Sequence, residues 1–471
     1  MPQVLIHTLG CKLNQLESES FADAFRQAGF SLYDPKACSL TDGGEISPSV
    51  IIVNTCTVTS KADQKARRII RKALRDYPDA SVIVTGCYAQ MDQTQIKELG
   101  KGFAEGRLFV FKGQDKNIIL NLPQIVSNKN KTQTSANAEK EFKSMIREVC
   151  GKIHICDDTD NLAAFQFAPE SFSAHTRSFL KIQDGCNKNC SYCRIRLARG
   201  PSISLNSQLA LERLRILEAN HSETVLTGVN ITQYRDEKAN NLGELLQYLL
   251  SGTAKINLRL SSLEPDSINE NFVQILSNSR IRPHFHLSIQ SGSEKILKMM
   301  NRSYNAEIIE KAVNLLRGLK DDPFLSCDII SGFPGENEAE FNETFDLCRK
   351  IGFSWIHVFP FSKRPGTPAW SFKDTVNEKE INKRVQLLTD LAWRSRENYT
   401  NRWLGREVDV LAEKNDSPES PCPGISENYL KLLIYYEGDN APVPGTVLRC
   451  RLGKKENNQK KDYDAVAYAD T

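Results

Sequence analysis

The run CNKNCSYC places three cysteines, Cys186, Cys190 and Cys193, in a C-x3-C-x2-C pattern. Thiolates this close can hold three corners of a [4Fe–4S] cluster, whereas clusters that only carry electrons usually take four cysteines. A cluster with three protein ligands keeps one iron open for a substrate or cofactor. A structural zinc site is the alternative, but zinc takes four N or S ligands, and the next His or Cys is His221. The spacing therefore favours a cluster with an open iron.

A second set of cysteines, Cys11, Cys56 and Cys87, is spread over the first part of the chain. Each cysteine comes just after a predicted buried strand. Because the carboxyl ends of parallel strands form the functional edge of an open sheet, we expect the three thiols to converge. The alternative is that each is a small buried hydrophobic residue, which is common for free cysteine. Their recurrence after three strands favours a ligand set.

The elements that must position this second set predict an open α/β domain over residues 1–126. Short apolar runs predict buried strands, and helical patterns lie between them, so we expect a parallel sheet. The predicted strands are 4–9, 50–54, 81–85 and 108–111, and the predicted helices include 17–28 and 60–76. Residues 35–48 predict a loop and the polar residues 127–144 a linker, within a segment, 127–174, without a clear pattern.

The triplet lies in a second domain, predicted over residues 175–403. Six apolar runs predict strands at 178–183, 223–227, 256–261, 284–289, 325–330 and 355–360. Helical patterns separate them at 207–219, 242–250, 268–278, 293–300, 305–319 and 336–351. Six repeats are too few for a closed eight-stranded barrel, so we expect a partial (β/α)6 barrel with functional groups after the strands. A long helix is predicted over 378–403.

The pattern changes after the long helix. Residues 404–466 hold β-rich runs, among them NYLKLLIYY and GTVLRCRL, broken by Pro, Gly, Asn and Asp. They predict a small antiparallel β-barrel. The polar run KKENNQKK near the end predicts disorder. The fold class is therefore a multidomain α/β protein with a terminal β-barrel.

Composition sets the remaining bounds. The chain has 471 residues, of which 40% are hydrophobic, and a net charge of +3. No apolar run approaches the roughly 18 residues of a membrane helix, and the N-terminus lacks a secretory signal, so no membrane partner is expected. Thirteen cysteines in such a chain indicate reduced thiols and metal ligation rather than disulfides. They favour a cytoplasmic location.

The motifs together resemble the methylthiotransferase family of radical S-adenosylmethionine (radical SAM) enzymes. They occur in the order TLGCKLNQLES, NTCTVT, TGCYAQ, CNKNCSYC, LTGVN, RLSSLEP, HLSIQSGS, DIISGFPGE and VFPFSKRPGTP. The resemblance implies a cluster domain, a radical SAM partial barrel and a C-terminal TRAM barrel. RLSSLEP and FSKRPGTP are most similar to the branch that acts on N6-threonylcarbamoyladenosine beside the tRNA anticodon.

The resemblance also implies the chemistry. The open iron of the triplet's cluster would chelate S-adenosylmethionine, whose cleavage leaves a 5′-deoxyadenosyl radical. Cys11, Cys56 and Cys87 would hold a second [4Fe–4S] cluster that carries the sulfur to be inserted. The target, carbon 2 of an adenine, has a C–H bond on which acid–base catalysis has little effect, so a radical is suited to attack it. A second S-adenosylmethionine would supply the methyl group.

Family positions that line the cofactor cavity match residues at the strand ends of the predicted barrel. By resemblance, the cofactor-binding residues are Tyr192, Gly228, Asn230, Ser261, Ser262, Glu264, Gln290, Ser291 and Asp328. Each alone could be only a packing, cap or turn residue. The run after the triplet, RIRLARGPSIS, departs from the usual family pattern: Arg194 and Arg196 are additional, later basic residues are missing, and Arg199 is retained.

The implied macromolecular partner is the tRNA anticodon stem-loop. Residues 61–75 hold seven basic residues and one acid, and five of the basic residues fall on one helical stripe that could follow phosphates: Lys61, Lys65, Arg68, Lys72 and Arg75. An ordinary solvated helix face is the alternative. Residues 403–471 carry nine basic and twelve acidic residues. An RNA role there would need local patches and stacking by residues such as Tyr429, Tyr435 and Tyr436.

Other functions stay open at this point. Related family branches act on N6-isopentenyladenosine in tRNA or on an aspartate of a ribosomal protein. A different class is a non-catalytic, metal-bearing RNA-binding protein, which would hold zinc or no metal and would not cleave S-adenosylmethionine. The run CGKIHIC over 150–156 offers three further possible ligands without a fourth. The sulfur donor and the electron donor are not identifiable from the sequence.

Overall fold

The computed structural model of the chain describes residues 2–33, 47–104, 106–130, 138–152, 161–172, 175–415, 421–436, 441–455 and 462–469. It divides into two compact units. The first comprises residues 1–173, 184–187 and 193–203, and the second comprises 174–183, 188–192 and 204–471. Most of the predicted loop 35–48, most of KKENNQKK, and His154 and Cys156 of CGKIHIC lie outside the described residues. No described helix is both long enough and apolar enough to cross a membrane.

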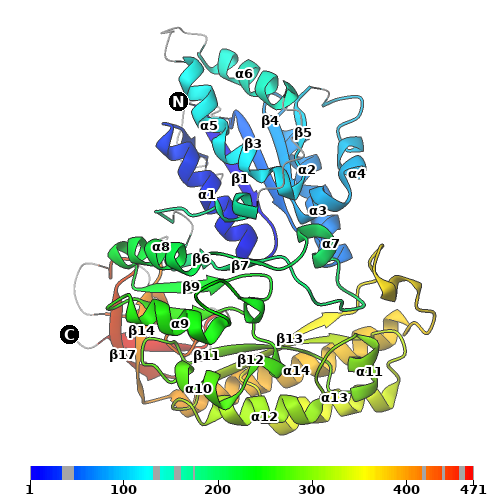
Figure 1. The fold of residues 1–471 in the computed structure, drawn as a ribbon, viewed down its shortest axis with the longest axis vertical. Helices are drawn as coiled ribbons and strands as arrows, with labels where there is room; N and C mark the ends of the chain where they lie inside the picture. Colours follow the sequence, from blue (N-terminus) through cyan, green and yellow to red (C-terminus); the bar gives the residue numbers. More distant parts are fainter. Residues whose placement is uncertain are drawn as a thin grey trace. The chain divides into compact units, whose positions relative to one another are not determined.

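The first unit is built on a parallel sheet in the order β2-β1-β3-β4-β5 (Figure 1). Its strands are β1 (Gln3–Thr8), β2 (Ser31–Leu32), β3 (Val50–Thr55), β4 (Ser81–Gly86) and β5 (Leu108–Val110). Every residue of β3 and β4 is buried, as expected for strands that are covered on both faces. The predicted strands and the parallel sheet are confirmed.

Two helical layers cover this sheet. One apolar core joins it to α1 (Lys12–Gln27), α5 (Lys116–Asn130) and α6 (Ala138–Lys152), and the other joins it to α2 (Ser60–Asp76), α3 (Cys87–Met91) and α4 (Gln93–Glu98). The short elements η2 (Gly113–Asp115), η3 (Asn161–Phe165) and α7 (Ile195–Arg199) complete this unit. Helix α1 begins five residues before the predicted start, directly after Cys11.

Much of the predicted linker, residues 127–144, is helical in the structure. Helix α5 continues to Asn130, and α6 begins at Ala138. Ile146 and Val149 of α6, and Phe167 after it, are buried in the same core as Phe21. The ring of Phe167 meets that of Phe21 edge-to-face, with centroids 5.7 Å apart. Polar residues on the outer face of α6 conceal this apolar stripe in the composition.

The second unit contains the predicted parallel barrel strands in two sheets, β10-β9-β6 and β11-β12-β13. They are β6 (Ser178–Lys181), β9 (Glu223–Thr227), β10 (Asn257–Leu260), β11 (His284–Gln290), β12 (Phe324–Ser331) and β13 (Trp355–Pro360), and isolated bridges join β10 to the β11 side. A short pair, β7 (Gln183–Asp184) and β8 (Ile203–Ser204), flanks the triplet loop. The arrangement confirms a partial barrel.

Helices alternate with these strands along the chain (Figure 1). They are α8 (Ser207–Asn220), α9 (Leu242–Ser251), α10 (Glu270–Leu276), α11 (Glu294–Met299), α12 (Ala306–Arg317) and α13 (Glu338–Ile351), with short turns η4 (Ile231–Gln233), η5 (Pro265–Ser267) and η6 (Pro368–Ser371). The long helix α14 (Glu378–Trp403) has the predicted bounds. Asn side chains cap several of these helices, and Asn337 with Glu340 forms a capping box on α13.

The C-terminal part of this unit is a closed barrel in the order β14-β15-β16-β18-β17. Its strands are β14 (Glu407–Ala412), β15 (Cys422–Ser426), β16 (Lys431–Tyr435), β17 (Val447–Gly453) and β18 (Ala465–Ala469). The predicted barrel is confirmed, but it is not wholly antiparallel, because β16 and β18 pair in parallel. Tyr399 and Trp403 of α14 pack into its core.

Candidate functional site

Sheet register brings together the strand ends that carry the N-terminal cysteines. Thr8 of β1 pairs with Asn54 of β3, which pairs with Thr85 of β4. Since neighbouring strands lie about 4.8 Å apart, the loops after them start side by side. Cys56 and Cys87 follow the paired residues Thr55 and Gly86 directly, so they occupy matching positions on adjacent strands.

Two glycines make this close approach possible. Gly10 and Gly86 each precede a cysteine and have φ angles of +103° and +100°, a conformation that costs other residues free energy. A Cβ on Gly10 would lie 2.8 Å from Cys56 Sγ, and one on Gly86 would lie 2.2 Å from the Thr55 carbonyl oxygen. The loops after β1, β3 and β4 are therefore in contact through backbone that only glycine permits.

Asn14, in the first turn of α1, ties these loops to each other. Its Nδ2 donates to the carbonyl oxygens of Leu9 (2.7 Å) and Thr55 (3.0 Å). Arg199 donates from Nη2 to Asn14 Oδ1 at 3.0 Å. Asn14 is fully buried, so each of its polar atoms is held by the fold. The side chain fixes the Cys11 loop against the Cys56 loop.

Buried charges surround this amide. Arg199 Nη1 lies 3.2 Å from Glu17 Oε1 and 3.1 Å from Asp184, and Lys116 Nζ lies 2.5 Å from the other Glu17 oxygen. The Glu17 side chain is only 1% exposed. A buried carboxylate is costly unless it is paired, and here two cations share it. Through Arg199, these ion pairs link Asp184, two residues before Cys186, to Glu17 of α1, the helix that begins after Cys11.

The three N-terminal thiols occupy one electrostatic neighbourhood. Loss of hydration raises the pKa of the buried Cys56 to about 12, and negative charge on Cys11 and Cys87 adds to this shift. Arg199 acts in the opposite direction on Cys56. Cys56 and Cys87 are buried, whereas Cys11 is exposed. The structure therefore brings the predicted trio together, with access at Cys11.

This trio suits an iron–sulfur cluster. Thiolates are the ligands that such clusters take, and Cys11 lies where an exposed ligand could meet a further reactant. Among the described residues, no group of three or more His, Cys, Asp or Glu side chains has an arrangement that could hold a metal ion. The cluster assignment therefore rests on the chemistry of the thiols and on the strand register.

The triplet cysteines have separate supports, and all three are partly exposed. The Cys186 N–H donates to the Gly200 carbonyl at 3.1 Å, and Cys193 Sγ accepts from the Ile195 N–H at 3.4 Å. Cys190, which belongs to the second unit, accepts from Arg302 Nη1 at 3.1 Å. Ligation by the three together stays a prediction from their spacing.

A polar group at the barrel's strand ends includes two of the expected cofactor residues. Asn230 Nδ2 donates to Glu264 Oε1 at 3.3 Å, and Arg302 forms an ion pair with Glu264. Burial raises the pKa of Glu264, an effect that Arg302 only partly offsets. Arg302 also donates to the Ser288 carbonyl at 3.0 Å. One arginine thus connects Cys190 with Glu264 and the end of β11.

Asp328 of β12 lies in a second polar group. It is 2.9 Å from Nε2 of His286, whose Nδ1 lies 2.9 Å from Ser326 Oγ. The ring of His286 is 5.3 Å from that of His357 on β13. His286, Ser326, Asp328 and His357 occupy alternate positions of adjacent strands, so they share one face of the sheet.

The other expected cofactor residues are placed in several ways. Ser291 is hydrogen-bonded to Thr344 at 3.1 Å, which directs it toward α13. Gln290 has a φ of +72° beside a register shift in β11. The space next to Gly228 is taken by Gln183, whose Oε1 would lie 2.8 Å from an added Cβ. Tyr192 packs against a buried apolar cluster that includes Ile296. Ser261 and Ser262 are partly exposed just after β10.

Sequence reasoning did not select several residues that organise these sites: Asn14, Glu17, Lys116, His286 and Arg302. Asn14 and Glu17 stand in the motif TLGCKLNQLES, and His286 begins HLSIQSGS, so attention to the polar positions of both motifs could have found them. Lys116 and Arg302 lie outside every motif that was used. Only the fold brings them to the cysteine loops.

Two family models match the chain. The model described as "Radical SAM superfamily" matches residues 180–348, and "Uncharacterized protein family UPF0004" matches residues 3–104. The first contains the triplet and most of the partial barrel. The second contains Cys11, Cys56 and Cys87. The two matches therefore correspond to the two cysteine sets.

Similar proteins cover almost the whole chain. A Treponema pallidum (strain Nichols) protein named "Threonylcarbamoyladenosine tRNA methylthiotransferase MtaB" is 37% identical over 96% of this chain and 98% of its own. A protein of the same name from Thermotoga maritima is 33% identical over 88% and 87%. A Rickettsia rickettsii (strain Sheila Smith) protein named "tRNA-2-methylthio-N(6)-dimethylallyladenosine synthase" is 27% identical over 97% and 98%.

Proposed function

Because the chain belongs to the MtaB-like radical SAM methylthiotransferases, we propose that it methylthiolates carbon 2 of N6-threonylcarbamoyladenosine at position 37 of tRNA. The gathering of Cys11, Cys56 and Cys87 at one sheet edge, in a chain that also has the radical SAM triplet, carries the proposal of methylthiotransfer. The choice of nucleoside is supported by the relatives named for threonylcarbamoyladenosine. A single cluster would serve radical formation alone. A second thiolate set provides a place for the sulfur that the product requires.

We assign one [4Fe–4S] cluster to Cys186, Cys190 and Cys193 and a second to Cys11, Cys56 and Cys87. When bound, these clusters and S-adenosylmethionine would supply the radical, the sulfur and the methyl group. Asn14 and Arg199 hold the Cys11 loop. Arg302 places a cation beside Cys190, where it compensates thiolate charge in a partly dry environment.

The chain's own residues would position the reactants. Asn230 and Glu264 offer both donors and acceptors at the strand ends, which suits the amino and carboxylate groups of S-adenosylmethionine. Asp328 and His286 place a hydrogen-bonded pair on the partly exposed face of the sheet. Such fixed polar groups orient a substrate without reorganising during the reaction.

Nucleoside mass spectrometry of tRNA tests the proposal. A strain that lacks the gene should lose 2-methylthio-N6-threonylcarbamoyladenosine and accumulate its unthiolated precursor, and the wild-type gene should restore the product. An unchanged level of the thiolated nucleoside would contradict the proposed substrate. Loss of the isopentenyladenosine derivative instead would assign the chain the activity named for the Rickettsia relative. We place this reaction in the cytoplasm. The mass-spectrometric test does not depend on which molecules donate the sulfur and the electrons.

Purified protein separates this function from non-catalytic RNA binding. After anaerobic reconstitution, the enzyme should hold roughly eight irons, which is two clusters of four, and form 5′-deoxyadenosine on reduction. A protein with bound zinc that does not cleave S-adenosylmethionine would be a binding module. The iron count and the cleavage assay are independent of the tRNA substrate, so each tests a different part of the proposal.

A further inference from the structure

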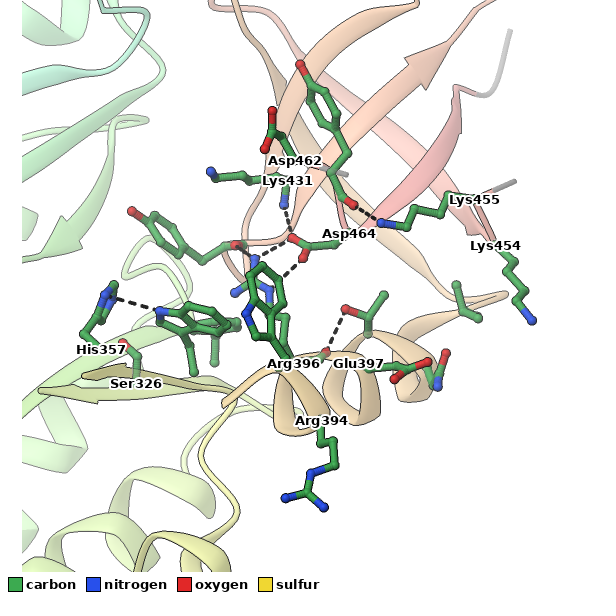
Figure 2. Close-up of a pocket in the computed structure, with 18 residues that line it drawn as sticks. Ser326, His357, Arg394, Arg396, Glu397, Lys431, Lys454, Lys455, Asp462 and Asp464 are labelled. Atoms are coloured by element: carbon green, nitrogen blue, oxygen red, sulfur yellow. Dashed lines mark hydrogen bonds and ion pairs between the residues drawn. The ribbon is translucent and has the colours of Figure 1, made fainter. Parts of the chain in front are cut away.

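A cavity of about 800 Å³ lies within the second unit, between α14, strands β12 and β13, and the C-terminal barrel (Figure 2). Its volume falls within the range of sites that hold small ligands, roughly 300–1,000 Å³. Neither Asn230 nor Glu264 lines it, whereas Ser326 and His357, which contact His286, form part of its wall. The proposed reaction uses the Asp328–His286 pair beside this wall but gives the cavity itself no role.

Two tryptophans form one side of the cavity. Trp393 of α14 and Trp355 of β13 meet edge-to-face, with ring centroids 4.9 Å apart. Trp355 Nε1 donates to Nδ1 of His357 at 3.2 Å, which fixes its ring. Trp393 is nevertheless 57% exposed. An aromatic ring with a fixed edge neighbour and an accessible surface can accept a flat ligand by stacking.

The back of the cavity is held by internal contacts. Arg396 Nε lies 2.8 Å from Asp464 Oδ1, and its Nη2 donates to the Tyr429 carbonyl at 3.1 Å. The guanidinium of Arg396 also lies over Phe324, 4.5 Å from the ring centroid. Tyr429 stacks on His284 at 4.0 Å. These groups are already paired, so they shape the cavity and keep it open. In particular, Tyr429 does not offer the free stacking surface that was expected of it.

Cations gather around the opening. Lys431, Lys454, Lys455 and Arg394 line the cavity in addition to Arg396, against Glu397, Asp462 and Asp464 (Figure 2). Lys455 Nζ donates to the Tyr463 carbonyl at 2.7 Å. Residues 403–471 as a whole carry more acids than bases. The positive excess is therefore local to this cavity.

The combination of chemistry identifies the class of ligand. An accessible aromatic ring beside several lysines is the arrangement that binds single-stranded nucleic acid, in which bases stack and cations follow the phosphates. An amphipathic protein helix would instead need a continuous apolar groove, and charged side chains interrupt this surface. We propose that the cavity holds one unstacked base of single-stranded RNA against Trp393, with the adjoining phosphates near Lys431 and Lys454.

This inference rests on the proposed tRNA substrate and adds a second contact to it. The base would belong to a loop nucleotide other than the one that is modified. Stacking tolerates any base, so the contact would contribute affinity and orientation, while the identity of the modified nucleoside would be read elsewhere.

Binding of a fluorescently labelled anticodon stem-loop, followed by anisotropy, tests the inference. Trp393→Ala should weaken binding about 5- to 150-fold, the range that removal of one stacking partner causes, whereas Trp393→Phe should stay within about three-fold because a ring is retained. Leu387→Ala, at a 40% exposed position of the same helix, is the matched control and should bind like wild type. Lys454→Glu, just after β17, should weaken binding and flatten its salt dependence, whereas Lys383→Glu, at an exposed position of α14 away from the cavity, should do neither.

Photocrosslinking supplies a direct readout. A stem-loop with 5-iodouridine in the loop should crosslink to Trp393, and peptide mass spectrometry should locate the adduct. Equal binding by Trp393→Ala and wild type, or equal weakening by Leu387→Ala, would overturn the cavity assignment while leaving tRNA methylthiolation intact. Failure of the wild-type protein to bind the stem-loop would overturn both proposals.

Discussion

The two cysteine sets are built by different means. Cys186, Cys190 and Cys193 are close in the sequence, so their spacing alone suffices to bring them together. Cys11, Cys56 and Cys87 are separated by 45 and 31 residues and meet only because β1, β3 and β4 are paired in register. The first set is a local property of one loop, whereas the second is a property of a sheet. Damage to packing should therefore affect them unequally.

Their supporting groups differ in the same way. Around the N-terminal set, Glu17, Lys116 and Arg199 form a buried charge network. Removing Glu17 would take away the carboxylate that pairs with the buried Lys116, and breaking a buried ion pair in this way typically costs about 3–5 kcal/mol. The triplet instead depends on single contacts, such as that from Arg302 to Cys190. Paired strands and buried ion pairs hold the N-terminal cysteine set in place, whereas individual side-chain contacts hold the triplet.

Cysteine variants should separate the two sets most sharply. Cys186→Ala should abolish 5′-deoxyadenosine formation, because under the proposed assignment it removes a ligand of the cluster that would bind S-adenosylmethionine. Cys56→Ala should leave that cleavage largely intact and abolish thiolated product. Both activities are measured by liquid chromatography with mass spectrometry on the reconstituted proteins.

Iron analysis provides the control for these variants. Each should keep roughly four of eight irons, which shows that the other cluster remains. Cys327→Ala, at a buried cysteine outside both sets, should keep all of them. Thiolated product from Cys56→Ala would show that the N-terminal set does not deliver sulfur.

A glycine substitution tests whether the sheet builds the N-terminal site. Gly86→Ala would place a Cβ 2.2 Å from the Thr55 carbonyl oxygen at a φ of +100°, so we expect a decrease of roughly 2–5 kcal/mol in the free energy of unfolding from backbone strain and overpacking. The N-terminal iron should be lost, and cleavage of S-adenosylmethionine should persist. Urea unfolding and iron analysis measure the two effects.

Gly29→Ala is the matched control for this change. Gly29 also has a positive φ, +86°, but nothing lies within 4 Å of an added Cβ. Only the backbone effect of roughly 1–2 kcal/mol should appear, and all the iron should be retained. Equal effects of the two substitutions would mean that close approach of the strand-end loops is not what assembles the site.

Much of this comparison was predictable from the sequence. Apolar runs located the strands of both units, and α14 and β13 have their predicted bounds, because long periodic patterns carry a strong local signal. The cysteine sets were found because spacing and strand ends are sequence features. The partners of Arg199 were not, since Asn14, to which it donates, lies 185 residues away and no local pattern encodes such a pairing.

Other features were missed for equally physical reasons. Helix α6 contributes Ile146 and Val149 to the core, yet its polar residues suggested a linker. The parallel pairing of β16 with β18 reflects barrel closure, which strand patterns do not specify. Tyr429 was expected to be available for RNA, but it stacks on His284 and lies near Arg259. Tertiary burial, not residue type, decides whether an aromatic ring is accessible.

A pH experiment probes stability away from both cysteine sets. Glu223 of β9 lies 2.7 Å from Arg259 and 3.0 Å from Arg282. Burial alone would raise its pKa, but Arg259 and neighbouring arginines outweigh this effect and lower the pKa from 4.5 to about 2. The folded state therefore binds fewer protons than the unfolded state, so the stabilisation is present above pH 4.5 and is lost as the pH falls toward 2. Its size is roughly 3 kcal/mol.

Glu223→Gln should remove that part of the pH dependence. Urea unfolding of the two proteins between pH 5 and pH 2.5 should give converging stabilities as the pH falls, and iron content at pH 7 should be equal. A parallel loss of iron would mean that any destabilisation empties the cysteine sites. In that case, loss of iron from Gly86→Ala would no longer show that the strand-end loops assemble the N-terminal site.

The smallest expected effect concerns the basic stripe of α2, the helix that follows the Cys56 loop. Lys65, Arg68 and Lys72 are all exposed, as predicted for a surface that could follow phosphates. Their combined replacement by Ala should weaken stem-loop binding only a few-fold near 0.1 M salt. It should also lower the slope of log affinity against log salt by about 0.7 for each phosphate that the protein no longer neutralises. Replacement of the exposed Lys97 and Lys101 is the control. An unchanged slope would make the stripe an ordinary solvated face, and the N-terminal unit would then contribute sulfur chemistry without holding RNA.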